Sequence, residues 1–293
     1  MLLLTRWASR FYTIKPTNQT INSLAIVGGG ASLPMLLAAL QALNKPLSIE
    51  IFDPHDLGTG HAFHPNNPMD FMTNTPGGDI NGFAHWWSGY PVGLQKTWPS
   101  DEPVPRAWVG LFLREKLQHI LDNPGTLEIA HIPKKVVDFH VPRTAGAEMI
   151  THLCTEDGAR YSADAYVIAV GQIGPHKQLP GVPPARVVNS IYPFVKNSSP
   201  LTRALEPLLL ESKTKPEVMI IGSGPSGIEA TTYLLKHYES RIAITLVGRL
   251  DDIPREIVFN GSVKVLMREI FEATPDNQKY TGMDLFINTT GIN

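Results

Sequence analysis

The sequence predicts an α/β fold with two parallel β-sheets, and two observations support this prediction. First, strand-like apolar runs alternate with a helical stretch in the order strand, helix, strand, which is typical of parallel sheets. Second, the same arrangement returns about 195 residues later in the chain of 293 residues. The two copies occupy residues 24–28, 32–43 and 48–52, and residues 218–221, 225–237 and 242–247.

The rest of the chain sets the boundaries of the predicted domains. Residues 1–20 form an N-terminal extension, whose basic and acid-free composition fits an organelle transit peptide or a poorly ordered tail. We expect a first domain at residues 21–195 and a second domain at 217–293. Residues 196–216 contain a helical stretch between polar breaks, and we interpret them as the linker.

One long segment separates the first copy from the next predicted helix. Residues 54–105 are rich in turn residues and aromatic side chains and show no long periodic stretch. A loop of this length in a compact domain is usually functional or disordered, and the aromatic content argues against disorder. A helix is predicted at 105–122, and short strands are predicted within 126–170. The apolar face of the helix comprises Val109, Phe112, Leu113, Leu117, Ile120 and Leu121.

The composition excludes several classes of function. The formal net charge is −2, so no basic field favours nucleic acid or anionic lipid as the main partner. No apolar run approaches the roughly 20 residues that span a bilayer. Cys154 is the single cysteine, which excludes an internal disulfide and a C-x-x-C pair. A reducing, cytoplasmic location is the simpler interpretation, and the basic N-terminus leaves an organelle as the alternative.

The second copy carries a glycine pattern with a defined chemistry. Gly222, Gly224 and Gly227 follow a strand and open a helix with the spacing G-x-G-x-x-G, and Pro225 and Ser226 lie between them. The first glycine allows a tight turn, the second lets a pyrophosphate approach the backbone, and the third lets helix and strand pack closely. The helix N-terminus adds free N–H groups for the phosphates. The sequence therefore predicts a Rossmann-like dinucleotide-binding domain here.

The end of the following strand indicates which dinucleotide binds. An NAD site usually has Asp or Glu at this position, where the carboxylate binds the ribose 2′-hydroxyl. Here the strand ends in TLVGRL, with Gly248 and Arg249 and no acid. An arginine suits a 2′-phosphate, so we predict NADPH at the second turn. An exposed arginine with no such role is the alternative.

The first copy carries a modified form of the same pattern. Gly28 and Gly30 are in place and Ser32 lies in the turn, but Leu33 stands at the third glycine position. A leucine there affects the packing of helix against strand, whereas the two glycines that face the phosphates remain. Asp53 ends the next strand, where an acid would bind an adenine ribose. We therefore predict a second Rossmann-like site at the first turn.

Two such turns in one chain, the first with an acid and the second with an arginine, resemble the two-domain FAD/NAD(P)-binding flavoproteins related to NADPH-dependent flavin monooxygenases. The resemblance covers residues 21–293, and several further segments add to it. These segments are DPHDLGTGHAF (53–63), FMTNTPGGDINGF (71–83), PRAWVG (105–110), DAYVIAVGQIGPHKQLPGV (164–182) and MDLFINTTG (283–291).

This resemblance implies FAD in the first domain and NADPH in the second. It also implies a monooxygenase-like cycle, in which NADPH delivers a hydride to the flavin and O2 is then activated for a small-molecule substrate. Asn74 matches an asparagine that lies beside the flavin ring, although a turn-capping asparagine is an equal alternative.

The chain also departs from this pattern. The first A-T-G motif reads AVG, the F-x-G-x-x-x-H-x-x-x-W fingerprint is missing, and the sequence ends at Asn293 where relatives continue. We therefore expect a second copy or a partner chain to cover the flavin.

Several other side chains have two interpretations. Arg106 could meet a phosphate or an acidic substrate, or it could be a solvated residue of a first helical turn. Trp86 and Trp87 could wall a pocket or simply pack. We predict no metal site, because four loop histidines lack metal-ligand spacing; these are His55, His61, His64 and His85.

Two other functions stay open at this point. One is an FAD/NAD(P)H oxidoreductase without oxygenation, outside the disulfide-reductase branch because C-x-x-C is missing. The other is a non-catalytic or truncated nucleotide-binding protein, which would account for Leu33 and the early end. The colour of the purified protein distinguishes a non-catalytic or truncated protein from the flavoenzymes.

Overall fold

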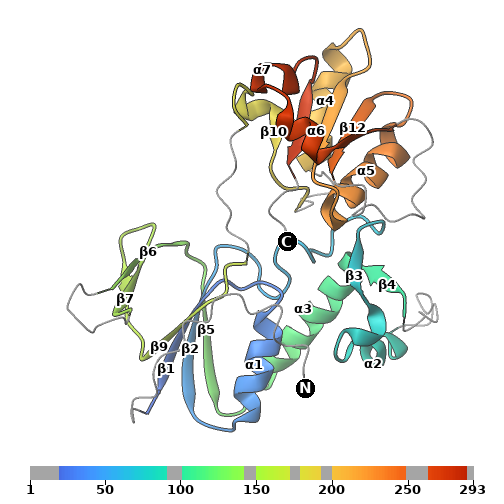
Figure 1. The fold of residues 1–293 in the computed structure, drawn as a ribbon. Helices are drawn as coiled ribbons and strands as arrows, with labels where there is room; N and C mark the ends of the chain where they lie inside the picture. Colours follow the sequence, from blue (N-terminus) through green and yellow to red (C-terminus); the bar gives the residue numbers. More distant parts are fainter. Residues whose placement is uncertain are drawn as a thin grey trace. The chain divides into compact units, whose positions relative to one another are not determined.

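The structure is a computed structural model that describes residues 20–90, 101–141, 150–171, 179–192, 200–248 and 263–288. The chain splits into two compact units (Figure 1). The first unit comprises Met1–Gly60 and Gly110–Gly171, and the second unit comprises His61–Val109 and Gln172–Asn293. In the described ranges, no helix is both long enough and apolar enough to cross a bilayer.

The first unit is built on a parallel sheet with the strand order β5-β2-β1-β9. Helix α1 connects β1 to β2, which confirms the first predicted β-α-β copy. Phe52 pairs with Val27, so both strands end at the same edge of the sheet. The elements are β1 (Ser23–Val27), α1 (Leu33–Ala42), β2 (Leu47–Phe52), β5 (Leu127–Ile132) and β9 (Ala165–Ile168).

Helices cover one face of this sheet and a small antiparallel sheet covers the other (Figure 1). Leu37 of α1 and Leu117 of α3 join Ile26 in one buried cluster, as the predicted apolar face of 105–122 requires. On the opposite face, Phe52 packs against Leu153. The covering elements are α3 (Arg106–Asp122), β6 (Val136–His140), β7 (His152–Thr155) and β8 (Arg160–Tyr161).

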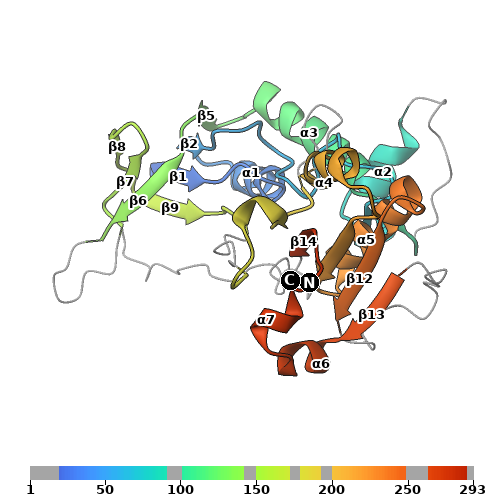
Figure 2. The same ribbon diagram turned by 90° about the horizontal axis from the view of Figure 1, so that it is seen from above.

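The second unit contains a parallel sheet with the order β10-β14-β11-β12-β13, seen from a second direction in Figure 2. Its order β14-β11-β12-β13 repeats the order β9-β1-β2-β5 of the first unit. The two copies are therefore the same supersecondary unit, and the predicted α/β class with two Rossmann-like parallel sheets is confirmed. The strands are β10 (Val187–Val188), β11 (Glu217–Ile221), β12 (Ala243–Gly248), β13 (Val263–Met267) and β14 (Leu285–Asn288).

Two helices supply the core on one face of the second sheet. Leu234 of α5 and both Leu201 and Leu205 of α4 are fully buried with Ile220 of β11. Helix α4 lies inside 196–216, the predicted linker. It packs as part of the second unit, because its leucines are buried against this face of the sheet. The remaining elements of this part are α4 (Pro200–Glu211), α5 (Pro225–Tyr238), α6 (Arg268–Ala273), α7 (Asp276–Lys279) and the 3-10 turn η3 (Pro184–Arg186).

The segment 61–109 belongs to the second unit, whereas the predicted boundaries place it with the first domain. Phe71 explains this grouping, because its buried ring packs edge-on against Tyr192 and Tyr233. The segment also holds short regular elements that the sequence pattern did not predict. They are β3 (Met72–Pro76), the 3-10 turn η1 (Gly77–Asp79), α2 (Phe83–Ser88) and β4 (Pro103–Pro105), with β3 and β4 antiparallel.

Candidate functional site

The first glycine of the first turn is required by its backbone and by its surroundings. Gly28 has a φ of +101°, and its N–H donates to the Phe52 carbonyl at 2.9 Å. A Cβ at this position would lie 2.4 Å from the Ala169 carbonyl oxygen. Residues 169–171 are the AVG segment, so this segment passes directly behind the turn. Any side chain larger than hydrogen would push the turn away from the sheet.

Asp53 reaches the same turn with its carboxylate. The Gly29 N–H donates to Oδ2 at 2.7 Å, and the His55 N–H donates to Oδ1 at 2.9 Å. Each oxygen still has a lone pair available, because an ionised carboxylate offers about four acceptor sites. The residue is half-buried and therefore accessible. This arrangement fixes an acceptor beside the glycine turn, as the binding of two ribose hydroxyls requires.

A second pair of glycines faces the turn, and the site prediction did not include it. The Gly58 N–H donates to the Gly29 carbonyl at 2.6 Å, and a Cβ on Gly60 would lie 3.4 Å from the Gly30 Cα. Gly30 and Gly60 are both half-buried. Two backbones without side chains thus border the place where a pyrophosphate would approach. The repeated glycines in DLGTG were the available signal.

The third fingerprint position is changed without loss of the helix. Leu33 is 1% exposed and packs in the core, and its N–H donates to the Gly30 carbonyl at 3.0 Å. Pro34 lies in the first turn of α1, where a missing N–H is tolerated. Ser32 is the exposed N-cap residue, and its hydroxyl makes no capping hydrogen bond. The leucine therefore changes only the packing of the helix against the strand, and the two glycines that face the phosphates remain.

The second turn has the complete geometry of the pattern. Gly222 has a φ of +113°, and its N–H donates to the Val247 carbonyl at 2.8 Å. Gly224 is the N-cap of α5, which begins at Pro225, and Gly227 is buried in the first turn of this helix. The start of a 14-residue helix directs free N–H groups and its positive dipole end outward from the turn.

Ser226 connects this turn to a buried polar network. Its hydroxyl bonds to the Tyr192 hydroxyl, which donates to Oε2 of Glu229, and Arg106 Nε donates to the other oxygen of Glu229 at 2.7 Å. Because the Ser226 side chain points inward, its predicted contribution to nucleotide binding rests on the backbone N–H. Arg106 is 8% exposed and pairs with Glu229, so it is not the solvated residue that one interpretation of the sequence expects.

The charges of this network are set by burial. Burial raises the pKa of the Glu229 carboxyl, while the adjacent Arg106 guanidinium lowers it. Burial, followed by the charge of Glu229, raises the pKa of the Tyr192 hydroxyl far above its usual range, so this group remains a proton donor. The network joins Arg106 at the start of α3 and Glu229 of α5 to Tyr192, which follows β10. We interpret it as support for the start of α5.

The other predicted residues lie in different surroundings. Asn74 is exposed in the middle of β3, so it does not cap a turn. Trp87 is buried and stacks on Trp108 with 4.4 Å between ring centroids, whereas Trp86 is half-buried. Arg249 lies outside the described residues. Within the described ranges, no three His, Cys, Asp or Glu side chains gather as a metal site would need.

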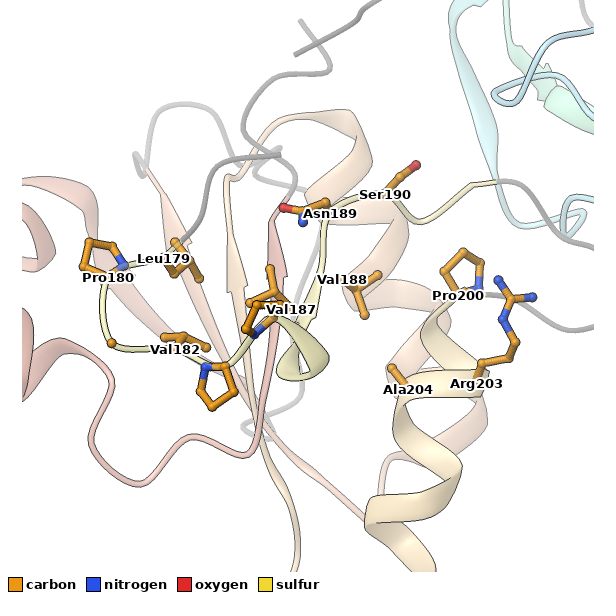
Figure 3. A pocket seen from close by; sticks show the side chains of 13 residues that line it. Leu179, Pro180, Val182, Val187, Val188, Asn189, Ser190, Pro200, Arg203 and Ala204 are labelled. Atoms are coloured by element: carbon orange, nitrogen blue, oxygen red, sulfur yellow. The ribbon is translucent and has the colours of Figure 1, made fainter. Parts of the chain in front are cut away.

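An open cavity of about 1110 Å³ lies elsewhere in the second unit (Figure 3). Val182, Val187 and Val188 line it together with Ala204 and Arg203 of α4. Among the described residues that border this cavity, none belongs to a glycine-rich turn. It is therefore not part of either candidate dinucleotide site.

Comparison with known proteins identifies the family. The sequence profile of the FAD-NAD(P)-binding family matches residues 25–173, slightly more than half of the chain. The chain belongs to this family. The matched region begins in β1 and includes the first turn, Asp53 and the AVG segment, which are the features that border the first candidate site. No protein of curated function matches the sequence.

Solved structures share the fold of this family member at low sequence identity. Reduced CoADR-RHD of Bacillus anthracis aligns with a TM-score of 0.50 at 14% identity, over 93% of this chain and 44% of its own. The bacillithiol disulfide reductases Bdr (YpdA) of Bacillus cereus and Staphylococcus aureus also align with TM-scores of 0.50, at 16% and 17% identity. These cover 84% and 85% of this chain, and 68% and 66% of their own.

The alignments establish two points about this family member. Its α/β fold extends across both units, and it spans less than half of the first of these neighbours and about two thirds of the others. The first turn fits an FAD adenosine and pyrophosphate, because an acceptor pair and two facing glycine backbones border it. The second turn fits the pyrophosphate of a nicotinamide dinucleotide, because a glycine-opened helix begins there.

Proposed function

We propose that this chain is an FAD-dependent oxidoreductase that uses NADPH, with FAD at the first turn and NADPH at the second. The observation that carries the proposal is the pair of equivalent turns that differ in one respect. The first turn holds the Asp53 carboxylate 2.7 Å from the Gly29 nitrogen, and the second has Gly248 at the equivalent strand end. A carboxylate suits a ribose diol, and its absence suits a 2′-phosphate.

The residues of the chain act by binding and orienting. Asp53 would accept hydrogen bonds from the adenine ribose of FAD, while Gly28, Gly30 and Gly60 let the backbone approach the pyrophosphate. The N–H groups at the start of α5 would bind the pyrophosphate of NADPH. FAD supplies the redox chemistry when bound, because it accepts a hydride from NADPH and passes the electrons to an acceptor.

The acceptor in this proposal is a small molecule rather than a disulfide within the chain. The structural neighbours include bacillithiol disulfide reductases, but Cys154 is the single thiol of this sequence. It lies in β7 of the three-stranded sheet, between its cross-strand neighbours Asp138 and Arg160, and not in either glycine turn. A dithiol relay therefore has no second sulfur to use.

Oxygen transfer to a substrate is the second candidate function, and the position of Asn74 favours it. Its side chain is exposed on β3, in the segment that resembles the flavin-side segment of monooxygenases. In this version O2 and a small-molecule substrate are the partners, and a second copy or another chain would cover the flavin. The ratio of peroxide released to NADPH consumed separates the two candidates, because oxygen transfer requires substrate-dependent suppression of peroxide.

Two measurements test the proposal together. Purified protein is titrated with FAD, and the FAD-loaded protein is then mixed with NADPH without oxygen. We expect saturable FAD binding, followed by loss of the oxidised flavin absorption. Protein that binds no FAD would contradict the first half of the proposal. Protein that binds FAD but is reduced by neither NADPH nor NADH would contradict the second.

A further inference from the structure

The two glycine-rich turns correspond position by position, because strand pairing fixes their register. Val27 pairs with Phe52 in the first unit, and Ile221 pairs with Val247 in the second. The residue that follows each strand partner is Asp53 in the first case and Gly248 in the second. Counting along the turns in the same way, Gly29 is equivalent to Ser223.

In the first unit, a side chain at the strand end lies over a glycine in the turn. Asp53 accepts the Gly29 N–H through Oδ2, and a Cβ built on Gly29 would lie 2.2 Å from the Leu57 Cδ2 and 3.2 Å from the Asp53 Cβ. Leu57 and Asp53 therefore fill the space beside Gly29. A glycine in the turn leaves room for both side chains.

In the second unit, the same space is filled from the opposite side. Ser223 is 3% exposed, and a Cβ built on Gly248 would lie 2.1 Å from both its Cβ and its Oγ. That is far closer than two side-chain carbons can approach, so the backbone would have to move. The turn serine and a strand-end side chain exclude each other. The pair Gly29–Asp53 is exchanged for Ser223–Gly248.

We infer that Ser223 excludes an acidic side chain from position 248 and thereby keeps the second turn open to a 2′-phosphorylated nucleotide. An acid at position 248 would accept the ribose 2′-hydroxyl of NADH and repel the 2′-phosphate of NADPH. Ser223 prevents this arrangement sterically and adds no negative charge. The inference deepens the proposed function, because it rests on nucleotide binding at the second turn, and it does not depend on Arg249.

Three variants of the full chain, loaded with FAD, test the inference by equilibrium binding of NADPH and NADH and by thermal unfolding. Gly248→Asp alone should lower the melting temperature and weaken both nucleotides, because its side chain collides with Ser223. Ser223→Gly alone should keep the preference for NADPH. In Ser223→Gly/Gly248→Asp, the ratio of NADPH to NADH affinity should fall by at least about tenfold, as expected for a hydrogen bond to a charged acceptor.

A neutral variant of the same shape separates charge from size. Ser223→Gly/Gly248→Asn should fold as well as the aspartate double variant and retain more of the NADPH preference. The inference is overturned if Gly248→Asp alone is as stable as the parent, or if the aspartate double variant keeps the parent's affinity ratio. It is also overturned if the asparagine double variant shows the same ratio of NADPH to NADH affinity as the aspartate double variant. A parent protein that binds neither nucleotide would instead contradict the proposed function.

Discussion

Replacing Arg106 with Met removes the cation of the buried network while keeping an apolar side chain of similar length. The Arg106 and Glu229 side chains are 10% and 8% exposed, and their atoms lie 2.7 Å apart. Removing one partner of such a pair leaves an uncompensated buried charge, which costs about 3–5 kcal/mol of unfolding free energy. We expect Arg106→Met to lose stability in this range at neutral pH, because within the described part of the chain Glu229 then retains only the Tyr192 hydroxyl as a donor.

The loss of stability should depend on pH, and its sign follows from Glu229. Burial raises the pKa of this carboxyl and Arg106 opposes the rise, so the pKa is higher still in Arg106→Met. The unfolded chain loses the proton near 4.5, whereas the folded variant holds it to higher pH. Between these two values the folded state binds more protons, so the unfolding free energy falls by up to about 1.4 kcal/mol for each pH unit.

Urea unfolding at several pH values from 5 to 8 measures this effect. Arg106→Met should be least destabilised near pH 5 and should lose stability as the pH rises. This loss should extend over a wider pH range than in the parent protein, because the pKa of Glu229 is higher in the variant. Arg106→Met/Glu229→Gln is the matched control, because it keeps the shape of Glu229 and removes its titration. A variant whose unfolding free energy falls by less than about 1 kcal/mol, or equally at every pH, would refute the reasoning.

Three further substitutions test the two turns. Asp53→Ala removes a charged acceptor worth about 1.5–3 kcal/mol, so FAD titration should give a dissociation constant raised at least several-fold, and unchanged affinity would remove Asp53 from the site. Gly28→Ala should lower the melting temperature and the bound flavin content, because its Cβ would lie 2.4 Å from the Ala169 oxygen; normal flavin content would show that the turn can move. Arg249→Ala should weaken NADPH and leave NADH nearly unchanged, whereas equal losses would mean that Arg249 binds atoms common to both.

The elements that the sequence predicts well are those with local signals. Glycine spacing and apolar runs placed the strands and helices around both turns within about one residue, because capping, turn geometry and burial act over a few positions. The acid at Asp53 was predicted to lie near the first turn for the same reason. Parallel strands that pair in register end at one edge of the sheet, so a strand-end residue lies beside the turn.

The features that sequence reasoning missed depend on distant contacts. Arg106 and Glu229 are 123 positions apart, and nothing around either residue indicates that they pair. The exclusion between Ser223 and Gly248 likewise becomes visible only when the two strands are placed side by side. Helix α4 was interpreted as part of a linker because its neighbours are polar, yet its leucines are buried against a sheet formed by other segments. Long-range packing decides such cases.

The anaerobic reaction of the FAD-loaded protein with NADPH tests the central claim most directly, because it requires both turns to bind their nucleotides at once. The account predicts that the oxidised flavin absorption disappears on mixing with NADPH, more completely at limiting concentration than with NADH. An FAD-loaded protein that stays oxidised with both nucleotides would contradict it.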